Sequence, residues 1–382
     1  MLRRIRIRNF KSLRDVEFVP GCNNVFIGPN GSGKSNIIDA LKFLTSIALG
    51  GLVPAVNSRG GFAEALWKGE PAAQSLALDL DLQFGAQGFR YEFEVESVGV
   101  GGMFVRREVL TALEGGRRLL STQAGQGKAL HMDGTHAFQT SSPVSLALLE
   151  SNVPGWFGTS IRNAIAGWRF YDLIPRHMEG SRQMVAAPFL TETGDNLVQF
   201  LLTLKAQYSN EFRELEQAAR DCFPSLSEII PWPTQHGQVT LTARERGLRT
   251  PVQAASLPHG ELVFLALLAL ICAPPEMGSP VNCIEEPESH LHPSLIQQIV
   301  PMLLARQREF EGRAEAMPTQ LFATTHSPYV VDAFPADALW LVAKDENGET
   351  RLEKPAQDQS LKALLEQGGL GDLAFSGALA AK

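Results

Sequence analysis

The sequence is poor in the features that mark secreted, disulfide-bonded or membrane proteins. It has only four cysteines in 382 residues, and no two of them form a C-x-x-C pair. Scattered cysteines argue against a disulfide framework or a zinc site and suit a reducing cytosol. The longest apolar run, Leu262–Ala273, is too short to span a bilayer and predicts a buried helix. The basic start of the chain is not followed by the apolar core of a signal peptide. We therefore expect a soluble cytoplasmic protein without a membrane partner.

The chain also lacks an excess of positive charge. Its formal net charge is −7, from 34 Lys and Arg against 41 Asp and Glu. Bulk charge therefore gives no argument for nucleic-acid binding, which would need a local basic patch. One candidate patch lies in the first predicted strand, where Arg4, Arg6 and Arg8 alternate with apolar residues and share one face. This face is either an exposed basic edge or a surface that contacts the DNA backbone.

A sustained heptad pattern is missing as well, which excludes long coiled-coil arms. The apolar fraction of 44% is ordinary for a globular protein, and the length allows two lobes. Alternating apolar residues over 76–110 predict antiparallel strands with one polar face, and residues 143–230 read as mainly helical. From 281 onward strands and helices alternate, as in an α/β parallel sheet. The predicted segments are an N-terminal part at 1–140, a helical lobe with a short β-hairpin at 141–255, and a C-terminal part at 256–382.

What the chain does contain is a glycine-rich loop, GPNGSGKS, from Gly28 to Ser35. The apolar run before it predicts a short strand and the helical spacing after it predicts a helix, which is the context of a P-loop. Glycines let backbone N–H groups close around phosphate oxygens, and the helix N-terminus adds partial positive charge. Lys34 is predicted to reach the outer phosphates, and the Ser35 hydroxyl to ligate Mg²⁺. The loop residues predicted to bind a nucleotide are Asn30, Gly31, Gly33, Lys34, Ser35 and Asn36.

Two later stretches put polar side chains at the ends of apolar strands. In VNCIEEPESHLHPSL, Glu285 is predicted to hold Mg²⁺ and Glu286 to act as general base on an attacking water. In LFATTHSPYVV, His326 is predicted to hydrogen-bond a γ-phosphate. Taken singly, strand-end carboxylates often face solvent and a strand-end histidine is more often structural. The three stretches in this order carry the functional interpretation.

Phosphate loop, carboxylate strand and histidine strand in this order resemble the ABC-type ATPases. The stretches IRNFKSL, IEEPESHLHP and TTHSP are similar to the RecF/SMC-like branch of that class. More narrowly, SRGGFAEALWKGE, GDNLVQFL and GDLAFSGAL resemble bacterial stand-alone AAA-type ATPases related to OLD proteins. The resemblance implies an α/β fold: an ABC-type ATPase head with a P-loop sheet core, an antiparallel β-subdomain and a helical lobe. It also implies ATP and Mg²⁺ as cofactors.

The resemblance implies a role for each matching residue. Lys34 and Ser35 are the Walker A residues, and Glu285 takes the Walker B metal position, which is usually Asp in ABC proteins. Glu286 is the general base, and His326 matches the switch histidine.

Two more roles rest on the resemblance alone. Gln139, in FQTSSPVS, falls where the family passes from its β-lobe into helices. It is the expected Q-loop residue, touching Mg²⁺ and the attacking water. Arg59, in SRGG, is expected to bind the nucleotide like the arginine that follows Walker A in SMC-like heads. The implied metal ligands are Ser35, Glu285 and Gln139.

ABC-type sites are completed by a second subunit, so the resemblance implies a homodimer that sandwiches ATP. The partner's signature loop caps the γ-phosphate with a serine hydroxyl and a helix N-terminus. Here the matching stretch is SLPHGEL, with signature positions Leu257, Pro258, Gly260 and Glu261. Proline at the serine position has neither a hydroxyl nor a backbone N–H, which predicts slow hydrolysis unless Ser256 substitutes for it.

OLD-type relatives carry a Toprim nuclease domain after the ATPase. Only about fifty residues follow TTHSP here, without a comparable acidic cluster, so we expect no fused nuclease. The resemblance implies a separately encoded effector, a nuclease or a toxin, gated by ATP in anti-phage defence. The alternatives are a RecF-like DNA-binding repair ATPase and, with less support, the nucleotide-binding subunit of a transporter.

Overall fold

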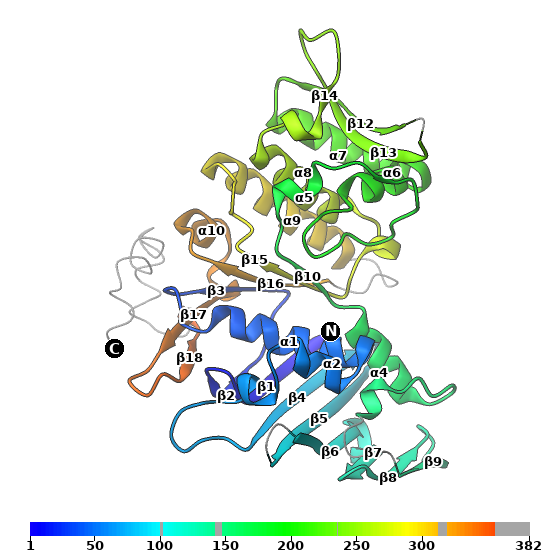
Figure 1. Cartoon of the computed structure of the whole chain (residues 1–382), viewed down its shortest axis with the longest axis vertical. Helices are drawn as coiled ribbons and strands as arrows, with labels where there is room; N and C mark the ends of the chain where they lie inside the picture. The colour runs from blue at the N-terminus through cyan, green and yellow to red at the C-terminus, as the bar shows by residue number, and fades with distance from the viewer. Residues whose placement is uncertain (100–101, 142–146, 235, 312–318, 356–382) are drawn as a thin grey trace. The chain divides into compact units, whose positions relative to one another are not determined.

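The computed structural model describes residues 1–99, 102–141, 147–234, 236–311 and 319–355 (Figure 1). These residues form two compact units, the first made of 1–168 and 336–355 and the second of 169–335. The predicted boundaries at 140 and 255 do not coincide with this division, because the chain returns to the first unit after residue 335. The GDLAFSGAL stretch lies outside the described residues.

The first unit contains an eight-stranded antiparallel sheet in the order β2-β1-β4-β5-β6-β7-β8-β9. Its period-two pattern is clear in β1, where Ile5 and Ile7 are fully buried between arginines. Strands Ser75–Phe84, Gln87–Val98 and Gly102–Ala112 pair antiparallel, which confirms the strands expected over 76–110, but residues 76–82 are buried on both faces instead of leaving one face to solvent. The strands are β1 (Leu2–Phe10), β2 (Leu13–Phe18), β4 (Ser75–Phe84), β5 (Gln87–Val98), β6 (Gly102–Ala112), β7 (Arg117–Gln123), β8 (Gln126–Leu130) and β9 (His136–Ser141).

The first unit also holds the strands and the helix that carry the glycine-rich loop. Strand β3 (Asn23–Ile27) pairs in parallel with β17 (Leu339–Lys344), which pairs antiparallel with β18 (Thr350–Glu353). Helix α1 (Lys34–Gly50) follows the loop, and its buried residues recur at helical spacing. The other described α-helices of the first unit are α2 (Leu52–Asn57), α3 (Phe62–Ala65) and α4 (Phe157–Ala166). The strand and helix predicted on either side of the loop are therefore confirmed.

The second unit is built around three parallel strands. Strand β15 (Val281–Glu285) pairs with β10 (Arg169–Tyr171) and with β16 (Gln320–Thr325). Helix α8 (His259–Cys272) is buried over most of its length, which confirms the buried helix predicted from the apolar run. Its other helices near these strands are α5 (Pro175–Met178), α9 (Pro293–Glu311) and α10 (Pro328–Ala333).

The rest of the second unit is a helical layer with a small antiparallel sheet. The helical stretch predicted around 196–223 is two helices, α6 (Leu197–Gln207) and α7 (Ser209–Cys222), because Tyr208 leaves the helical conformation. The sheet has the order β11-β13-β12, with β14 beside β13. Its strands are β11 (Arg182–Gln183), β12 (Leu226–Pro233), β13 (Gln238–Glu245) and β14 (Val252–Gln253).

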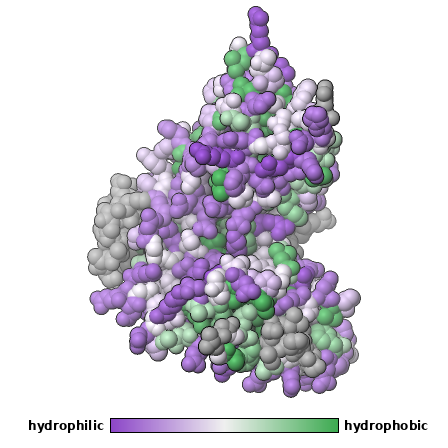
Figure 2. Space-filling model, in the orientation of Figure 1, coloured by the Kyte–Doolittle hydropathy of each residue, from purple (hydrophilic) through white to green (hydrophobic). Residues whose placement is uncertain are grey.

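Most side chains on the molecular face in Figure 2 are hydrophilic. Among the described residues, no helix is both long enough and apolar enough to cross a membrane.

Candidate functional site

The glycine-rich loop has the backbone conformation that its sequence predicts. Gly31 and Gly33 have φ values of 79° and 108°, a region that residues with a Cβ rarely adopt. Helix α1 begins at Lys34, directly after the loop, and Gly33 at its N-cap offers no side-chain cap. The first N–H groups of the helix therefore lack a side-chain cap at the point where an anion would bind.

Two loop glycines are also required by close packing. A Cβ on Gly28 would lie 2.0 Å from the backbone oxygen of Val342 in β17. A Cβ on Gly33 would lie 2.1 Å from the Thr350 hydroxyl oxygen in β18. Glycine at these two positions therefore lets the loop pack closely against β17 and β18.

We expect Gly28→Ala to destabilise the protein more than Gly31→Ala does. The first substitution forces a methyl group against a backbone carbonyl, an overpacking that costs about 1–3 kcal/mol. The second meets no atom within 4 Å and suffers only its positive φ, about 1 kcal/mol. Thermal melts without nucleotide measure both, and 1 kcal/mol corresponds to roughly 1–2 °C in a chain of 382 residues. Equal melting temperatures for the two variants would contradict the packing argument.

Lys34 lies against the loop that it is predicted to serve. Its ammonium donates hydrogen bonds to the carbonyls of Gly28 at 2.8 Å and Pro29 at 3.1 Å, and the residue is buried. The Asn30 and Ser35 side chains are exposed, so both can meet a ligand. The Asn36 amide instead donates a hydrogen bond to the Ser12 hydroxyl at 2.7 Å.

Two hydroxyl residues that the sequence analysis missed support the loop from behind. The Ser12 and Thr350 hydroxyl oxygens are 2.7 Å apart, and the Thr350 hydroxyl donates to the Ser32 carbonyl at 2.9 Å. Ser12 lies within the IRNFKSL stretch, so a signal for it existed. Thr350 carries no sequence signal, since it reaches the loop only through the strand order β3-β17-β18.

Arg59 is held by helix α1 rather than left open to a nucleotide. Its guanidinium contacts the Asp39 carboxylate at 2.6 Å and lies 5.1 Å from the Phe43 ring centre, with only 9% of the side chain exposed. Burial raises the pKa of the Asp39 carboxyl, but hydrogen bonds from Arg59 and Lys11 lower it, and the lowering prevails. The structure thus places Arg59 in an ion pair with Asp39, and its nucleotide contact stays a prediction.

Gln139 also lies away from the loop. It is exposed on β9, the outermost strand, six strand spacings from β1, whose turn into β2 carries Ser12. At about 4.8 Å per spacing that is roughly 29 Å along the sheet. The strand order thus does not bring Gln139 beside Ser12, and its role as a metal-contacting Q-loop residue stays a prediction.

The arginine face of β1 is not a free basic patch. Arg4 contacts Glu17 at 2.6 Å, Arg6 contacts Asp15 at 2.8 Å, and Arg8 contacts Asp79 at 3.3 Å. The three arginines do share one face, but β1 lies between β2 and β4 and is not an edge strand. Cross-strand carboxylates thus offset the positive charge that a DNA backbone would require.

In the second unit, the structure brings the predicted base and the predicted switch histidine together. Strands β15 and β16 are parallel neighbours, with Glu285 opposite Thr324, so their carboxyl ends meet. Glu286 follows with a φ of 42° and donates its N–H to the Thr324 carbonyl at 3.0 Å. Its Oε1 lies 3.6 Å from His326 Nε2, and 51% of its side chain is exposed. A carboxylate and an imidazole are therefore paired beside solvent.

The predicted signature loop ends at the start of a helix, as the ABC-type pattern requires. Helix α8 begins at His259, and Pro258 is its N-cap with φ −56° and ψ 138°. Leu257 is buried below it. A Cβ on Gly260 would lie 2.6 Å from the His290 carbonyl, so glycine lets the loop after the paired glutamates pack onto α8. Burial, with a smaller effect from Glu245, raises the pKa of Glu261.

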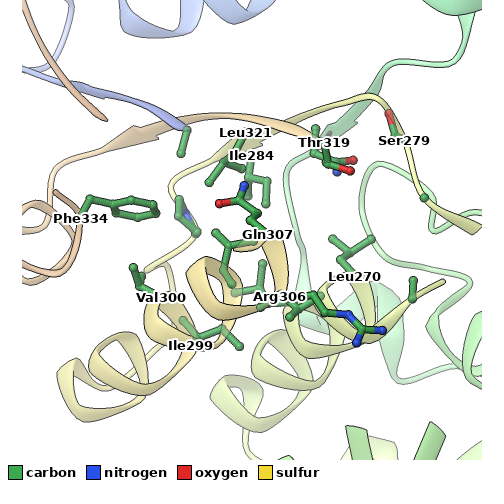
Figure 3. A pocket seen from close by; sticks show the side chains of 18 of the residues that line it. Leu270, Ser279, Ile284, Ile299, Val300, Arg306, Gln307, Thr319, Leu321 and Phe334 are labelled. Carbon is green, nitrogen blue, oxygen red and sulfur yellow. The ribbon is translucent and has the colours of Figure 1, made fainter. Parts of the chain in front are cut away.

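A separate cavity of about 340 Å³ lies in the second unit between β15 and β16 and helices α8 and α9 (Figure 3). Ile284 and Leu321 line its strand side, and Ile299 and Val300 line its helix side. Its size suits a small ligand. The cavity contains none of the glycine-rich loop, and its lining is mainly apolar, although Arg306 and Gln307 also reach it.

Known proteins were compared with the chain in three ways. A family model described as "AAA domain, putative AbiEii toxin, Type IV TA system" matches residues 24–332. No curated protein matches the chain.

Several solved structures share its fold. The SMC head domain from Thermotoga maritima superposes with a TM-score of 0.50 at 16% identity, covering 92% of this chain and 98% of its own. An SMC head bound to the C-terminal winged-helix domain of ScpA gives 0.59 at 14% identity, covering 92% and 97%. The Pyrococcus furiosus SMC head with an extended coiled coil gives 0.54 at 13% identity, covering 96% and 99%. The fold is therefore that of an SMC-head ATPase, a mixed α/β head, as the sequence predicted.

Proposed function

We propose that this chain, which belongs to the AAA-domain family matched over residues 24–332 and has the fold of an SMC-head ATPase, is a slow ATP-hydrolysing switch. In this proposal it works as a dimer and controls a separate effector. ATPase chemistry of the AAA and SMC-head type follows from the family and the fold. The closer kinship with stand-alone ATPases related to OLD proteins is part of this proposal. The observation that carries the hydrolytic part is the 3.6 Å approach of Glu286 and His326.

The glycine-rich loop would bind the nucleotide phosphates. Its positive-φ glycines and the start of α1 suit a phosphate. Lys34 would exchange its bonds to the loop carbonyls for bonds to phosphate oxygens, which are stronger because both partners are charged.

Magnesium would be held in the manner usual for nucleotide sites. Mg²⁺ is commonly bound through one or two protein side chains together with substrate phosphates, rather than in an all-protein cage. The Ser35 hydroxyl and the Glu285 carboxylate supply side chains of this kind. Among the described residues no group of three His, Cys, Asp or Glu side chains forms a cage, which agrees with this mode. When bound, the metal would neutralise charge on the phosphates.

Glu286 would act as the general base. Its carboxylate is half exposed, so a water molecule can reach it, and the backbone bond from its N–H to Thr324 fixes its position. His326, at hydrogen-bond range of the same carboxylate after a small rearrangement, would donate to the γ-phosphate and so report its presence.

The second copy of the chain would complete the site through the N-terminus of its α8 helix. That helix is 14 residues long, and its first turn carries partial positive charge suited to a phosphate. Pro258 removes the hydroxyl that the signature serine would supply, so hydrolysis should be slow, as in a switch rather than a motor.

Pro258→Ser is expected to speed hydrolysis by roughly 10- to 150-fold, the effect of one added hydrogen bond to a charged phosphate made in the transition state. The substitution fits the loop, because φ −56° and ψ 138° suit serine, which is also a favoured N-cap. Steady-state phosphate release measures the rate, and Pro258→Ala is the matched control because it restores the N–H without the hydroxyl. If serine is no faster than alanine, or if the wild type already turns over like a motor, the role given to Pro258 is wrong.

The family description names a putative toxin of a type IV toxin–antitoxin system, which is a system of two components. We infer that this component is a nuclease or toxin encoded nearby and that the pair serves in anti-phage defence. The test is co-purification of the product of each neighbouring gene with the ATP-loaded Glu286→Gln protein. Lys34→Ala is the nucleotide-free control. Equal recovery of every neighbouring product with both variants would contradict ATP-gated control.

A further inference from the structure

Glu288, two residues after the proposed base, makes the densest set of side-chain contacts in this region. Its Oε1 accepts hydrogen bonds from the Thr325 hydroxyl at 2.7 Å, the His326 N–H at 2.8 Å and the Ser327 N–H at 3.1 Å. Its other oxygen, Oε2, is buried and has no partner within the described part of the chain. The hydrogen bonds of the Glu288 carboxylate therefore go to the turn that carries His326.

Besides this carboxylate, the turn has a hydrogen bond from the Ser327 N–H to the Thr325 hydroxyl at 2.9 Å. Helix α10 begins right after the turn, has only six residues, and receives no side-chain cap from its N-cap, Ser327. A carboxylate that accepts backbone N–H groups at such a position makes charge-assisted bonds. Glu288 therefore fixes the backbone on both sides of the His326 Cα.

The same short loop reaches the signature helix. The Ser289 N–H donates to the Glu286 carbonyl at 2.8 Å, and the Leu291 N–H donates to the Glu288 carbonyl at 2.8 Å. These bonds make a compact turn. Its His290 carbonyl oxygen lies 2.6 Å from the position that a Cβ on Gly260 of α8 would take. The loop that follows Glu286 therefore contacts both the turn that carries His326 and the start of α8.

We propose that Glu288 is a positioning residue that holds His326 against Glu286 and links their geometry to the start of helix α8. Only the kinetic consequence of this proposal rests on the proposed function. The structural part, in which the Glu288 carboxylate clamps the His326 turn by its hydrogen bonds to Thr325, His326 and Ser327, rests on those bonds alone.

The clamp is tested by amide hydrogen exchange over residues 320–334 in the full chain. In Glu288→Ala the amides of His326 and Ser327 lose a charged acceptor, so their exchange should quicken by at least about tenfold. Glu288→Gln keeps one acceptor oxygen and should restore part of the protection. Glu276→Gln, an exposed glutamate in the same unit, should leave exchange unchanged. Unaltered exchange in Glu288→Ala would overturn the clamp.

The positioning role is tested by a double-mutant cycle on ATP hydrolysis. Glu288→Ala should lower kcat, up to about 100-fold, through misplacement of the histidine, and leave KM for ATP unchanged. The double variant Glu288→Ala/His326→Ala should be no slower than His326→Ala alone, since Glu288 acts through His326. Additive losses would overturn the positioning role. A wild type without ATPase activity would refute the proposed function, whereas the exchange experiment would still decide the clamp.

Discussion

The Glu286→Gln variant is expected to hydrolyse ATP about 10²- to 10⁴-fold more slowly than the wild type while still binding it. Glutamine keeps the size of the side chain and its φ of 42°, but it cannot accept a proton from the attacking water. Binding should survive because the phosphate contacts are made by the glycine-rich loop. Single-turnover phosphate release and calorimetric ATP binding measure the two effects separately.

A closed dimer should accumulate in the same variant. ATP that is bound but not hydrolysed would keep two copies joined across the nucleotide, so light scattering should report twice the protomer mass with ATP and the protomer mass without it. Glu276→Gln is the control for loss of one exposed carboxylate. Unchanged mass with ATP would contradict dimer closure, and unimpaired hydrolysis would remove Glu286 from the role of base.

Lys34→Ala is expected to lose most of the affinity for ATP. Its charge-assisted hydrogen bonds to phosphate are worth roughly 1.5–3 kcal/mol, or about 10- to 150-fold in the dissociation constant. Calorimetry on wild type and variant measures the change directly.

The control must separate lost phosphate contacts from a disturbed loop, because the Lys34 ammonium also bonds to Gly28 and Pro29. Lys34→Met keeps the buried aliphatic stem, and Lys128→Ala removes an exposed lysine elsewhere in the same unit. We expect Met to bind as weakly as Ala, and Lys128→Ala to bind like the wild type. Equal ATP affinity of Lys34→Met and the wild type would refute the P-loop assignment.

Local pattern alone was enough to predict the parts of this protein whose conformation is set by neighbouring residues. The strand–loop–helix around Gly31 follows from an apolar run, glycines and helical spacing, all within about twenty-five residues. The antiparallel strands over 76–110 and the buried helix α8 follow in the same way from periodicity. The order of the three polar stretches was also sufficient to predict the ATPase head.

The sequence alone did not predict the ion pairs that strand pairing and helix packing create. The alternating arginines of β1 indicate a possible basic patch, but strand pairing places Asp15, Glu17 and Asp79 beside them. The resemblance predicts that Arg59 contacts the nucleotide, whereas in the structure it forms an ion pair with Asp39 of α1.

Tertiary structure alone decided which residues support the site. Thr350 reaches the glycine-rich loop because β18 is hydrogen-bonded to β17, and β17 to β3, across more than 300 residues of sequence separation. Glu288 meets the His326 turn because β15 and β16 are parallel neighbours whose ends coincide. Gln139 lies on the edge strand β9 because each hairpin of the antiparallel sheet carries the chain one strand further from β1. Periodicity specifies that a strand forms and which face it buries, but the identity of its neighbour depends on long-range packing and register, to which residues anywhere in the chain contribute.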